Sequence, residues 1–309
     1  MITIGIQTKG LLPCIDTMRA FENIRNAGFD CVDFNLDSFL PNSSLYSGQI
    51  GSFFDFSVRE LNLLFGEYKA QMESVGLKAS QMHAPYPIWV DNRKEQNDYV
   101  MKNVIPKSLA IAKIMEIPWV VIHPMKMQKI YGKDEEIRKN IEYYKTLVPM
   151  LKEYGVGVCV EDLYESIGGR IIEGPCTDVR EAIGYIDTLN DYAGEELFGL
   201  CLDTGHLQLT KQNPVPYIHS IGSRLKVLHL HENDSANDVH QMPFTYGYNE
   251  DDGLDWQAIA HALSDIGFDG TLSFETYPCA NAFPKDILPI TLRTIYAIGD
   301  YLRQSMMNN

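Results

Sequence analysis

Six residues that could bind a metal ion or transfer a proton each stand at the end of a short apolar run in this 309-residue chain. They are three histidines and three carboxylates: His83, His123, Glu161, Asp203, His231 and Glu275. The carboxylates offer hard oxygen ligands and His231 offers an imidazole, a mixture that suits Mn²⁺, Mg²⁺, Co²⁺ or Zn²⁺. Carboxylates buried at one point repel one another unless a cation lies between them. The sequence therefore predicts a divalent metal bound by Glu161, Asp203, His231 and Glu275.

Five further residues are candidates for the same site. His206 ends the tetrapeptide Asp-Thr-Gly-His and is expected just beyond the metal ligands, whereas Asp238 and His240 could add ligands from a later loop. Trp89 either packs a covering loop onto the protein or stacks against the apolar face of a substrate. Glu165 is either a polar contact to a substrate or a solvated side chain.

The apolar runs that carry the six residues predict eight strands, each followed by an amphipathic stretch. We expect strands over 2–6, 31–34, 77–83, 119–123, 156–161, 197–203, 225–231 and 271–275. We expect helices over about 16–27, 57–75, 94–116, 134–153, 177–189, 214–222, 255–266 and 284–303. Eight strand–helix units are the count of a (β/α)8 barrel, in which the carboxyl ends of the strands converge on one mouth. The six residues are therefore predicted to lie close together.

Two observations favour a closed barrel over an open, doubly wound sheet. No Gly-x-Gly-x-x-Gly motif opens the first strand–helix unit, and no linker rich in Pro, Gly or Ser divides residues 1–309. We therefore expect one α/β domain, a single (β/α)8 TIM barrel. Segment 35–56 is longer than a usual strand-to-helix loop and is predicted to cover the barrel mouth.

The composition narrows the classes of partner. The chain has 41 acidic and 26 basic residues, and its net charge of −15 disfavours binding to nucleic acid or to an anionic membrane surface. The start of the sequence does not have the pattern of a signal peptide, and no apolar run is long enough to cross a bilayer. The six cysteines lack Cys-x-x-Cys spacing and are expected to be buried free thiols. We therefore expect a cytoplasmic protein that binds neither nucleic acid nor membranes.

The polar motifs resemble those of the xylose-isomerase-like TIM-barrel superfamily, which contains sugar isomerases and epimerases and is related to the family 2 apurinic endonucleases. The motifs are VED (160–162), CLDTGH (201–206), LHLHEND (228–234), DVH (238–240) and SFET (273–276). In the ketose 3-epimerase branch, the residue at the position of His206 contacts substrate, and the metal is held at the positions of Glu161, Asp203, His231 and Glu275. That branch also places an arginine six residues after its metal-binding histidine, but here Asn237 stands at this position.

The endonuclease branch of the superfamily binds up to three metals. Its additional ligands correspond to His83, His123, Asp238 and His240, so a second or third metal is left open. The charge pattern separates the branches, because Val227 to Pro284 contains ten acidic residues and neither Lys nor Arg, whereas loops that bind DNA need cations that pair with phosphates. The same gap disfavours a phosphorylated substrate. The nearest basic candidates are Lys126 and Lys129.

The predicted function is that of a divalent-metal-dependent sugar isomerase or epimerase, in which Glu161 and Glu275 transfer a proton through an enediolate. Its partner is a small sugar or polyol, and a homo-oligomer is compatible with the sequence. The expected substrate contacts are His83, His123, His206, Trp89 and Glu165. The alternative is a metal-dependent dehydratase of a cyclic polyol or keto-acid. An apurinic endonuclease and a non-catalytic sugar-binding protein are less favoured.

Overall fold

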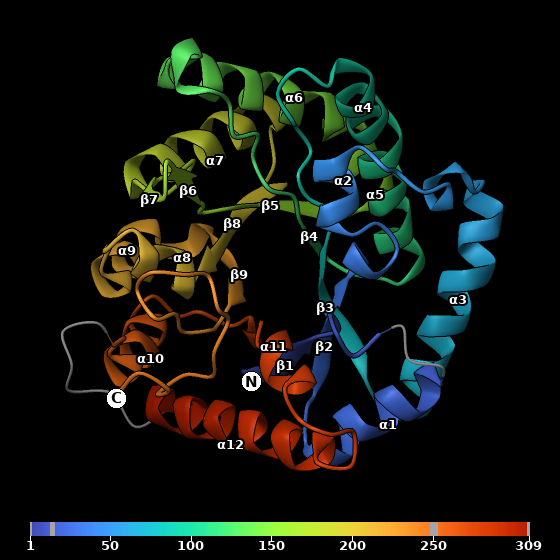
Figure 1. Ribbon diagram of the computed structural model, residues 1–309, viewed down its shortest axis with the longest axis vertical. Coiled ribbons are helices and arrows are strands. Elements are labelled where there is room, and N and C mark those ends of the chain that lie inside the picture. Colours follow the sequence, from blue (N-terminus) through green and yellow to red (C-terminus); the bar gives the residue numbers. More distant parts are fainter. Residues whose placement is uncertain (1, 13–15, 248–252, 308–309) are drawn as a thin grey trace.

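Eight parallel strands form the centre of the protein in the order β10-β1-β2-β3-β4-β5-β8-β9 (Figure 1). The computed structural model describes residues 2–12, 16–247 and 253–307. The eight strands are β1 (Thr3–Gln7), β2 (Cys31–Asn35), β3 (Lys78–His83), β4 (Trp119–Val121), β5 (Gly157–Glu161), β8 (Phe198–Asp203), β9 (Leu225–His229) and β10 (Thr271–Phe274). The first and last strands of this order meet just beyond β9, where the Leu230 amide donates to Ser273 O at 2.8 Å. The sheet closes on itself, and the predicted single (β/α)8 barrel is confirmed.

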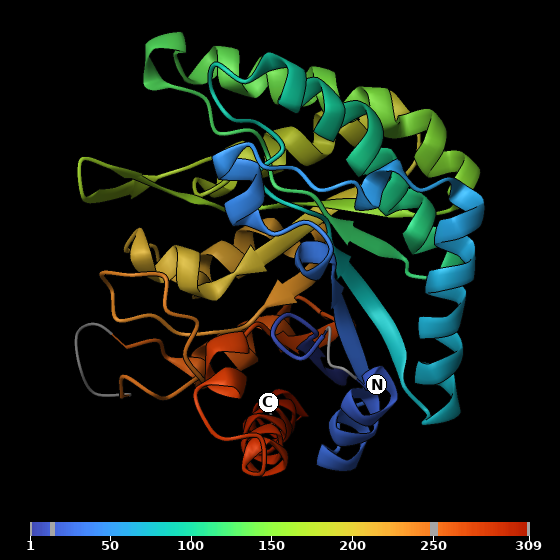
Figure 2. The ribbon, with the colours of Figure 1, turned by 45° about the vertical axis from the view of Figure 1, so that its right-hand side comes forward.

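Helices surround the barrel and cover the outer faces of its strands (Figures 1 and 2). The main ones are α1 (Thr17–Ala27), α3 (Val58–Ser74), α5 (Ile105–Ile114), α6 (Lys133–Tyr154), α7 (Val179–Ala193), α9 (Pro214–Ile221), α10 (Trp256–Asp265) and α12 (Leu288–Met307). Their bounds lie close to the predicted ranges, except that the stretch 94–116 is divided into α4 (Lys94–Tyr99), a π-helical turn (Val100–Val104) and α5. Local capping fixes some of these ends, as where Ser57 and Glu60 form a reciprocal capping box at the start of α3.

The strand period explains why polar residues gather at the mouth. Alternate residues of a strand face the same side, so every second residue of these strands points into the barrel. Small apolar side chains from four neighbouring strands pack in one such layer, namely Val121, Cys159, Cys201 and Val227. Two positions further along the same strands, the inward-facing residues are His123, Glu161, Asp203 and His229. The apolar layer therefore forms a floor beneath a polar layer.

An antiparallel hairpin follows β5, in the connection between β5 and α7. Its strands β6 (Tyr164–Ile167) and β7 (Arg170–Glu173) extend away from the barrel (Figure 2). The two residues between them, Gly168 and Gly169, have φ values of 59° and 77°. A two-residue turn with two positive φ values is the type I′ turn, for which Gly-Gly is a favoured pair. The Gly-Gly pair is therefore the local sequence signal for this hairpin.

Several short elements lie around the mouth. Segment 35–56 contains two 3₁₀ turns, Leu36–Ser38 and Phe53–Asp55, and the short helix α2 (Asn42–Ser47) between them. Helix α8 (Thr204–Leu209) follows β8 directly, and α11 (Tyr277–Asn281) follows β10. These elements supply side chains to the site described below.

Two expectations concern the chain as a whole. Within the described ranges, no helix combines the length and apolar character needed to cross a membrane. The described cysteines, Cys31, Cys159, Cys176, Cys201 and Cys279, are free and buried, in agreement with the expected free thiols. Cys14 lies outside the described residues.

Candidate metal and active site

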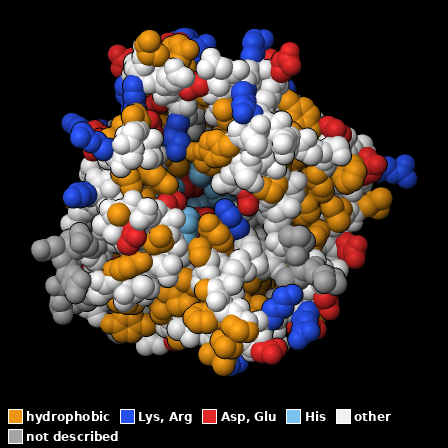
Figure 3. All heavy atoms as spheres, viewed as in Figure 1, with side chains coloured by type: hydrophobic (Ala, Val, Ile, Leu, Met, Phe, Trp, Pro, Cys, Tyr) orange, Lys and Arg blue, Asp and Glu red, His pale blue; other side chains and the backbone are white. Residues whose placement is uncertain are grey.

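A cavity of about 240 Å³ opens at the carboxyl ends of the barrel strands. It appears as a hollow near the centre of one face of the protein, with histidine and acidic side chains inside it (Figure 3). Candidates from the sequence that line it are His83, His123, Glu161, His206, Asp238, His240 and Glu275. Segment 35–56 contributes Asn35, Asp37, Asn42 and Tyr46 to the same lining. The cations among the described lining residues are Lys9 and Lys126.

Asp203 and His231 contact each other below this cavity. His231 Nε2 lies 2.9 Å from Asp203 Oδ1, and both side chains are fully buried. Asp203 also caps α8, because the same Oδ1 accepts the amide hydrogen of His206 at 2.8 Å. Gly205 is required beside the pair, since a Cβ atom there would lie 2.0 Å from His231 Cε1. The Asp-Thr-Gly-His motif therefore positions the carboxylate and leaves room for the imidazole.

A second group of polar side chains adjoins this pair on the side of the loop after β9. Asp238 Oδ2 lies 3.2 Å from His240 Nε2 and 3.7 Å from His206 Nε2. The ring of His240 stacks on that of His231, with a centroid distance of 4.0 Å. Burial disfavours the protonated imidazole, but the nearby carboxylates outweigh it and raise the pKa of His240 to about 9. In turn, His240 and His206 hold the pKa of Asp238 well below its ordinary value despite its burial.

Glu161 at the end of β5 faces the two histidines of β3 and the β4 loop. Glu161 Oε2 lies 3.0 Å from His123 Nε2 and 3.7 Å from His83 Nε2. The Nε2 atoms of the two histidines are 2.9 Å apart. Burial lowers the pKa of His123 to about 4, in spite of the neighbouring carboxylate. His83 is held by the Ala84 carbonyl, which lies 2.7 Å from its Nδ1. Both imidazoles therefore present Nε2 toward Glu161.

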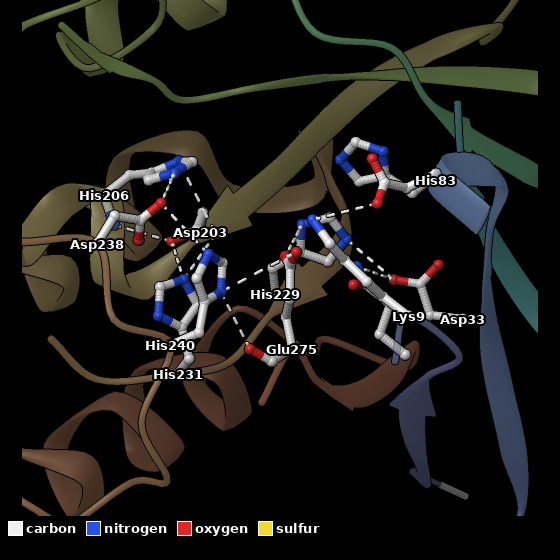
Figure 4. A network of polar contacts seen from close by, with 12 residues as sticks. Lys9, Asp33, His83, Asp203, His206, His229, His231, Asp238, His240 and Glu275 are labelled. Atoms are coloured by element: carbon white, nitrogen blue, oxygen red, sulfur yellow. Dashed lines mark hydrogen bonds and ion pairs between the residues drawn. The ribbon is translucent and has the colours of Figure 1, made fainter. Parts of the chain in front are cut away.

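His229 occupies the centre of the site and was not among the predicted residues. Its Nδ1 lies 3.2 Å from Glu161 Oε2 and 3.1 Å from Glu275 Oε2, while its Nε2 lies 3.0 Å from Asp33 Oδ2. Figure 4 shows His229 with Asp33 on one side and Glu275 on the other. Both His229 and Asp33 are fully buried. The two glutamates proposed for proton transfer thus approach one nitrogen atom from different strands.

The donor set fits a divalent cation. Two ligands of one ion lie at most about 5 Å apart, because each bond is about 2.0–2.6 Å long. Four sets of described residues offer ligand atoms within 4.8 Å of one another: His83, Glu161 and His229; Glu161, Asp203 and His206; Asp203, His229 and Glu275; and His231, Asp238 and His240. Buried polar atoms without a hydrogen-bond partner within the described structure include His123 Nδ1 and His231 Nδ1. Unpaired imidazole nitrogens of this kind, gathered beside several buried carboxylates, are what a bound cation resolves.

Two of the predicted substrate contacts lie at the edge of the site. Trp89 lines a neighbouring cavity that shares Tyr46, Tyr86 and Lys126 with the mouth cavity, and its indole donates to Asp91 Oδ1 at 3.0 Å. Glu165 lies on the hairpin, where its Oε1 pairs with Lys129 Nζ at 2.5 Å. The partner of Glu165 is therefore a lysine of the β4 loop.

Sequence reasoning missed four buried or lining residues, namely Lys9, Asp33, Asp162 and His229. His229 could have been found, because it precedes His231 by two positions on a strand and must face the same side. Asp33 is a charge within an apolar strand, a pattern that predicts a buried partner. Asp162 follows Glu161; burial raises the pKa of its carboxyl, and its Oδ1 accepts the Asp203 amide hydrogen at 2.8 Å. No local signal identified Lys9, which β1 brings to the cavity.

The fold and the polar centre at its mouth define a class of parallel barrels with a functional site at the carboxyl ends of the strands. The chain belongs to the xylose isomerase-like TIM barrel family, whose model matches residues 21–292. The resemblance seen in the sequence motifs is thus confirmed at the level of the superfamily.

Comparison with individual proteins gives relatives in sequence and in structure. An uncharacterized protein of Sinorhizobium fredii, y4fM, is 35% identical over 81 residues, which are 26% of this chain and 24% of that protein. An L-ribulose 3-epimerase shares 16% identity with a TM-score of 0.68, covering 98% of this chain and 96% of that one. A 3-keto-D-glucoside 4-epimerase of E. coli also shares 16% identity with a TM-score of 0.68, and the match covers 96% of this chain and 100% of that protein. These structural likenesses show a shared fold.

Proposed function

We propose that the protein is a divalent-metal-dependent sugar isomerase or epimerase that transfers a proton through an enediolate. The observation that carries this proposal is the placement of Glu161 and Glu275. Their carboxylates come from β5 and from the residue after β10, line one cavity, and both lie within 3.2 Å of His229 Nδ1. Two carboxylates that reach one small cavity from different strands can act on one substrate carbon, one as base and the other as acid.

The residues that would hold the ion are Glu161, Asp203, His231 and Glu275. When bound, a divalent ion withdraws electrons from a carbonyl and its adjacent hydroxyl, which acidifies the carbon between them. The candidate ligands of a further ion are His83, His123, Asp238 and His240. The number and identity of the ions are therefore part of the proposal to be measured.

The remaining lining residues would bind and orient the sugar. His206 is held by the Asp162 carbonyl, 2.8 Å from its Nδ1, so its Nε2 faces Asp238 and the cavity. The proposed contacts also include His83, His123, Trp89 and Glu165. Asn42 and Tyr46 of α2 line the cavity, and we propose that segment 35–56 covers the bound substrate and excludes water from it.

Membership of a family that contains sugar-active enzymes supports this proposal. Proteins with the same fold also support it, among them a D-psicose 3-epimerase whose structure was determined with D-fructose, at 13% identity and a TM-score of 0.67. That structure covers 97% of this chain and 99% of its own. The proposed substrate is a small sugar or polyol, and the proposed compartment is the cytoplasm. A dehydratase of a cyclic polyol or keto-acid would use the same two glutamates and is the alternative.

The test is proton exchange from solvent. The purified protein, loaded with Mn²⁺ or another divalent ion, is incubated in D2O with a panel of ketoses, aldoses and cyclic polyols, and NMR follows deuterium at each carbon. Incorporation at the carbon next to a carbonyl supports an isomerase or epimerase, and loss of water from the product, seen by mass, supports the dehydratase. Absence of exchange across the panel, or efficient incision of abasic DNA at physiological salt, would overturn the proposal.

A further inference from the structure

Lys126 presents a cation to the cavity from a rigid loop. It follows His123 in the loop after β4, and its neighbours are fixed to α6. The Met125 amide donates to Asn140 Oδ1 at 2.7 Å, and the Met127 amide donates to a carboxylate oxygen of Glu136 at 2.8 Å. Asn140 and Glu136 are both buried. The backbone on each side of Lys126 is therefore anchored, so that the position of this lysine is determined in advance of any ligand.

The ammonium group of Lys126 has aromatic and carbonyl neighbours. Its Nζ donates to the Tyr164 carbonyl at 3.0 Å and lies 5.4 Å from the ring centre of Tyr86 and 5.5 Å from that of Tyr164. Among the described residues, no carboxylate lies within 4 Å of it. A partly buried cation without a counter-ion is unfavourable, because its hydration is reduced and no opposite charge replaces it.

The other lysines near the mouth differ from Lys126 in this respect. Lys9 Nζ lies 3.8 Å from Asp37 Oδ2 and 4.5 Å from the ring centre of Tyr277. Lys129 Nζ pairs with Glu165 Oε1 at 2.5 Å. Burial lowers the pKa of Lys126, while more distant groups such as Glu165 and Asp238 act against that shift. Both of these carboxylates already have closer partners, in Lys129 and His240.

The aromatic neighbours of Lys126 link it to the polar layer. The ring of Tyr86 lies 4.1 Å from that of His123, and the ring of Tyr164 lies 5.1 Å from that of His206. The two tyrosine rings thus lie between Lys126 and the histidines of the site. A ligand that binds among those histidines can place a terminal group at this ammonium.

We propose that Lys126 binds a carboxylate of the substrate, so that the preferred substrates are sugar acids rather than neutral sugars. This inference rests on the proposed function, because it assigns a substrate class to the same site. A carboxylate carries the single negative charge that one ammonium balances. A phosphate is less suitable, because the loops after β9 and β10, where barrels commonly bind phosphate, contain no Lys or Arg between Val227 and Pro284.

The test compares substrates that differ only at one end. D-fructose, D-fructuronate and D-fructose 6-phosphate carry a hydroxymethyl, a carboxylate and a phosphate at the same carbon, and D-tagatose with D-tagaturonate repeats the first comparison in another configuration. Isothermal titration calorimetry gives the affinity of each probe, and deuterium exchange in D2O gives turnover separately. We expect at least one acid to bind about 10–100-fold more tightly than its neutral parent, the range for hydrogen bonds to charged groups.

Lys126→Met tests the assignment to this residue, and Lys129→Met is its control from the same loop. We expect Lys126→Met to remove the preference for the acid while changing the affinity for the neutral sugar less than about threefold, and Lys129→Met to keep the preference. Lys126→Arg, which retains the charge, should restore part of it, and circular dichroism checks that each variant is folded.

Equal affinity for acids and neutral sugars, preference for the phosphate, absence of acid binding, or an unchanged preference in Lys126→Met would each overturn the inference. These outcomes leave the proposed function standing if any sugar exchanges deuterium. Acid binding that depends on Lys126 but occurs without exchange on any probe would instead contradict the proposed function and keep the carboxylate site.

Discussion

Asp33 and His229 form a buried ion pair across the barrel, with Asp33 Oδ2 3.0 Å from His229 Nε2. The two residues come from β2 and β9, and the aspartate also accepts a hydrogen bond from the side-chain amide of Gln81 at 3.1 Å. Because Asp33 holds Nε2, the other ring nitrogen is directed toward Glu161 and Glu275. Burial disfavours the imidazolium, but neighbouring groups raise the pKa of His229 well above its ordinary value. This pair therefore fixes the orientation of the group on which both glutamates converge.

Replacement of Asp33 by Ala should destabilise the protein by about 1–3 kcal/mol, because it leaves the buried Nε2–H of His229 without its acceptor while Glu161 and Glu275 remain beside Nδ1. Urea unfolding of the metal-free protein measures this change. Asp265→Ala is the matched control, since it removes an exposed contact with His219 (3.1 Å) and should cost less than about 1 kcal/mol. A loss at Asp33 no larger than that of the control would show that the buried pair does not stabilise the barrel.

Metal binding is expected to depend on the ligands at the strand ends. Asp203→Asn and His231→Gln should each weaken binding of Mn²⁺ or Zn²⁺ by at least about tenfold, since changes even to the supporting partners of ligands cost 10–100-fold. Elemental analysis after dialysis gives the metal content, and the rise of the melting temperature on adding metal gives an independent readout. His219→Gln, at an exposed position on α9, should retain full metal content. Wild-type loading of the Asp203 and His231 variants would contradict the proposed ligand set.

The sequence was sufficient for the barrel and for much of the site, for a physical reason. Each strand is a short apolar run whose last polar residue marks the carboxyl end, and barrel closure then places these ends together. Asp33 was missed because its contact with His229, 196 positions away, exists only once the barrel has closed. Lys9 was missed because it reaches the cavity beside Tyr277 only through the pairing of β1 with β10. His229 was missed because only the terminal residue of each strand was considered. Local patterns therefore give the candidate ligands, while the contacts between them depend on register.

The stability of the metal-free protein should decrease as the pH rises from about 6.5 to about 9.5. The pKa of His240 is raised to about 9 in the folded protein by Asp238 and Glu275, acting against burial, compared with about 6.5 when unfolded. The folded state then binds the proton more tightly, so its stabilisation is complete below pH 6.5 and is lost as the pH passes through 9. For one buried histidine this is on the order of 3 kcal/mol.

Urea unfolding in the presence of a chelator at several pH values measures this loss of stability. Asp238→Asn removes the main carboxylate beside His240, whose Nε2 lies 3.2 Å from Asp238 Oδ2, and should flatten the decrease. Asp265→Asn, beside the exposed His219, should leave it unchanged. A metal-free wild-type protein whose stability is constant or increases over this range would contradict the assignment of a charged His240.

Glu275→Gln should retain metal but lose proton transfer. Glutamine has the size of glutamate and one coordinating oxygen, so metal binding should weaken without disappearing; the lost group is the base, whose contribution is typically 10²–10⁴-fold. Glu161→Gln should behave alike, and because the two act on one substrate the double variant should lose much less than the product of the single losses. The measurement is deuterium exchange at the reacting carbon, with metal content determined on the same sample.

Glu173→Gln, on the exposed hairpin, is the control and should exchange at the wild-type rate. If metal-loaded Glu275→Gln also exchanges at that rate, Glu275 is not the base, and Glu161 or His206 is the residue to test next.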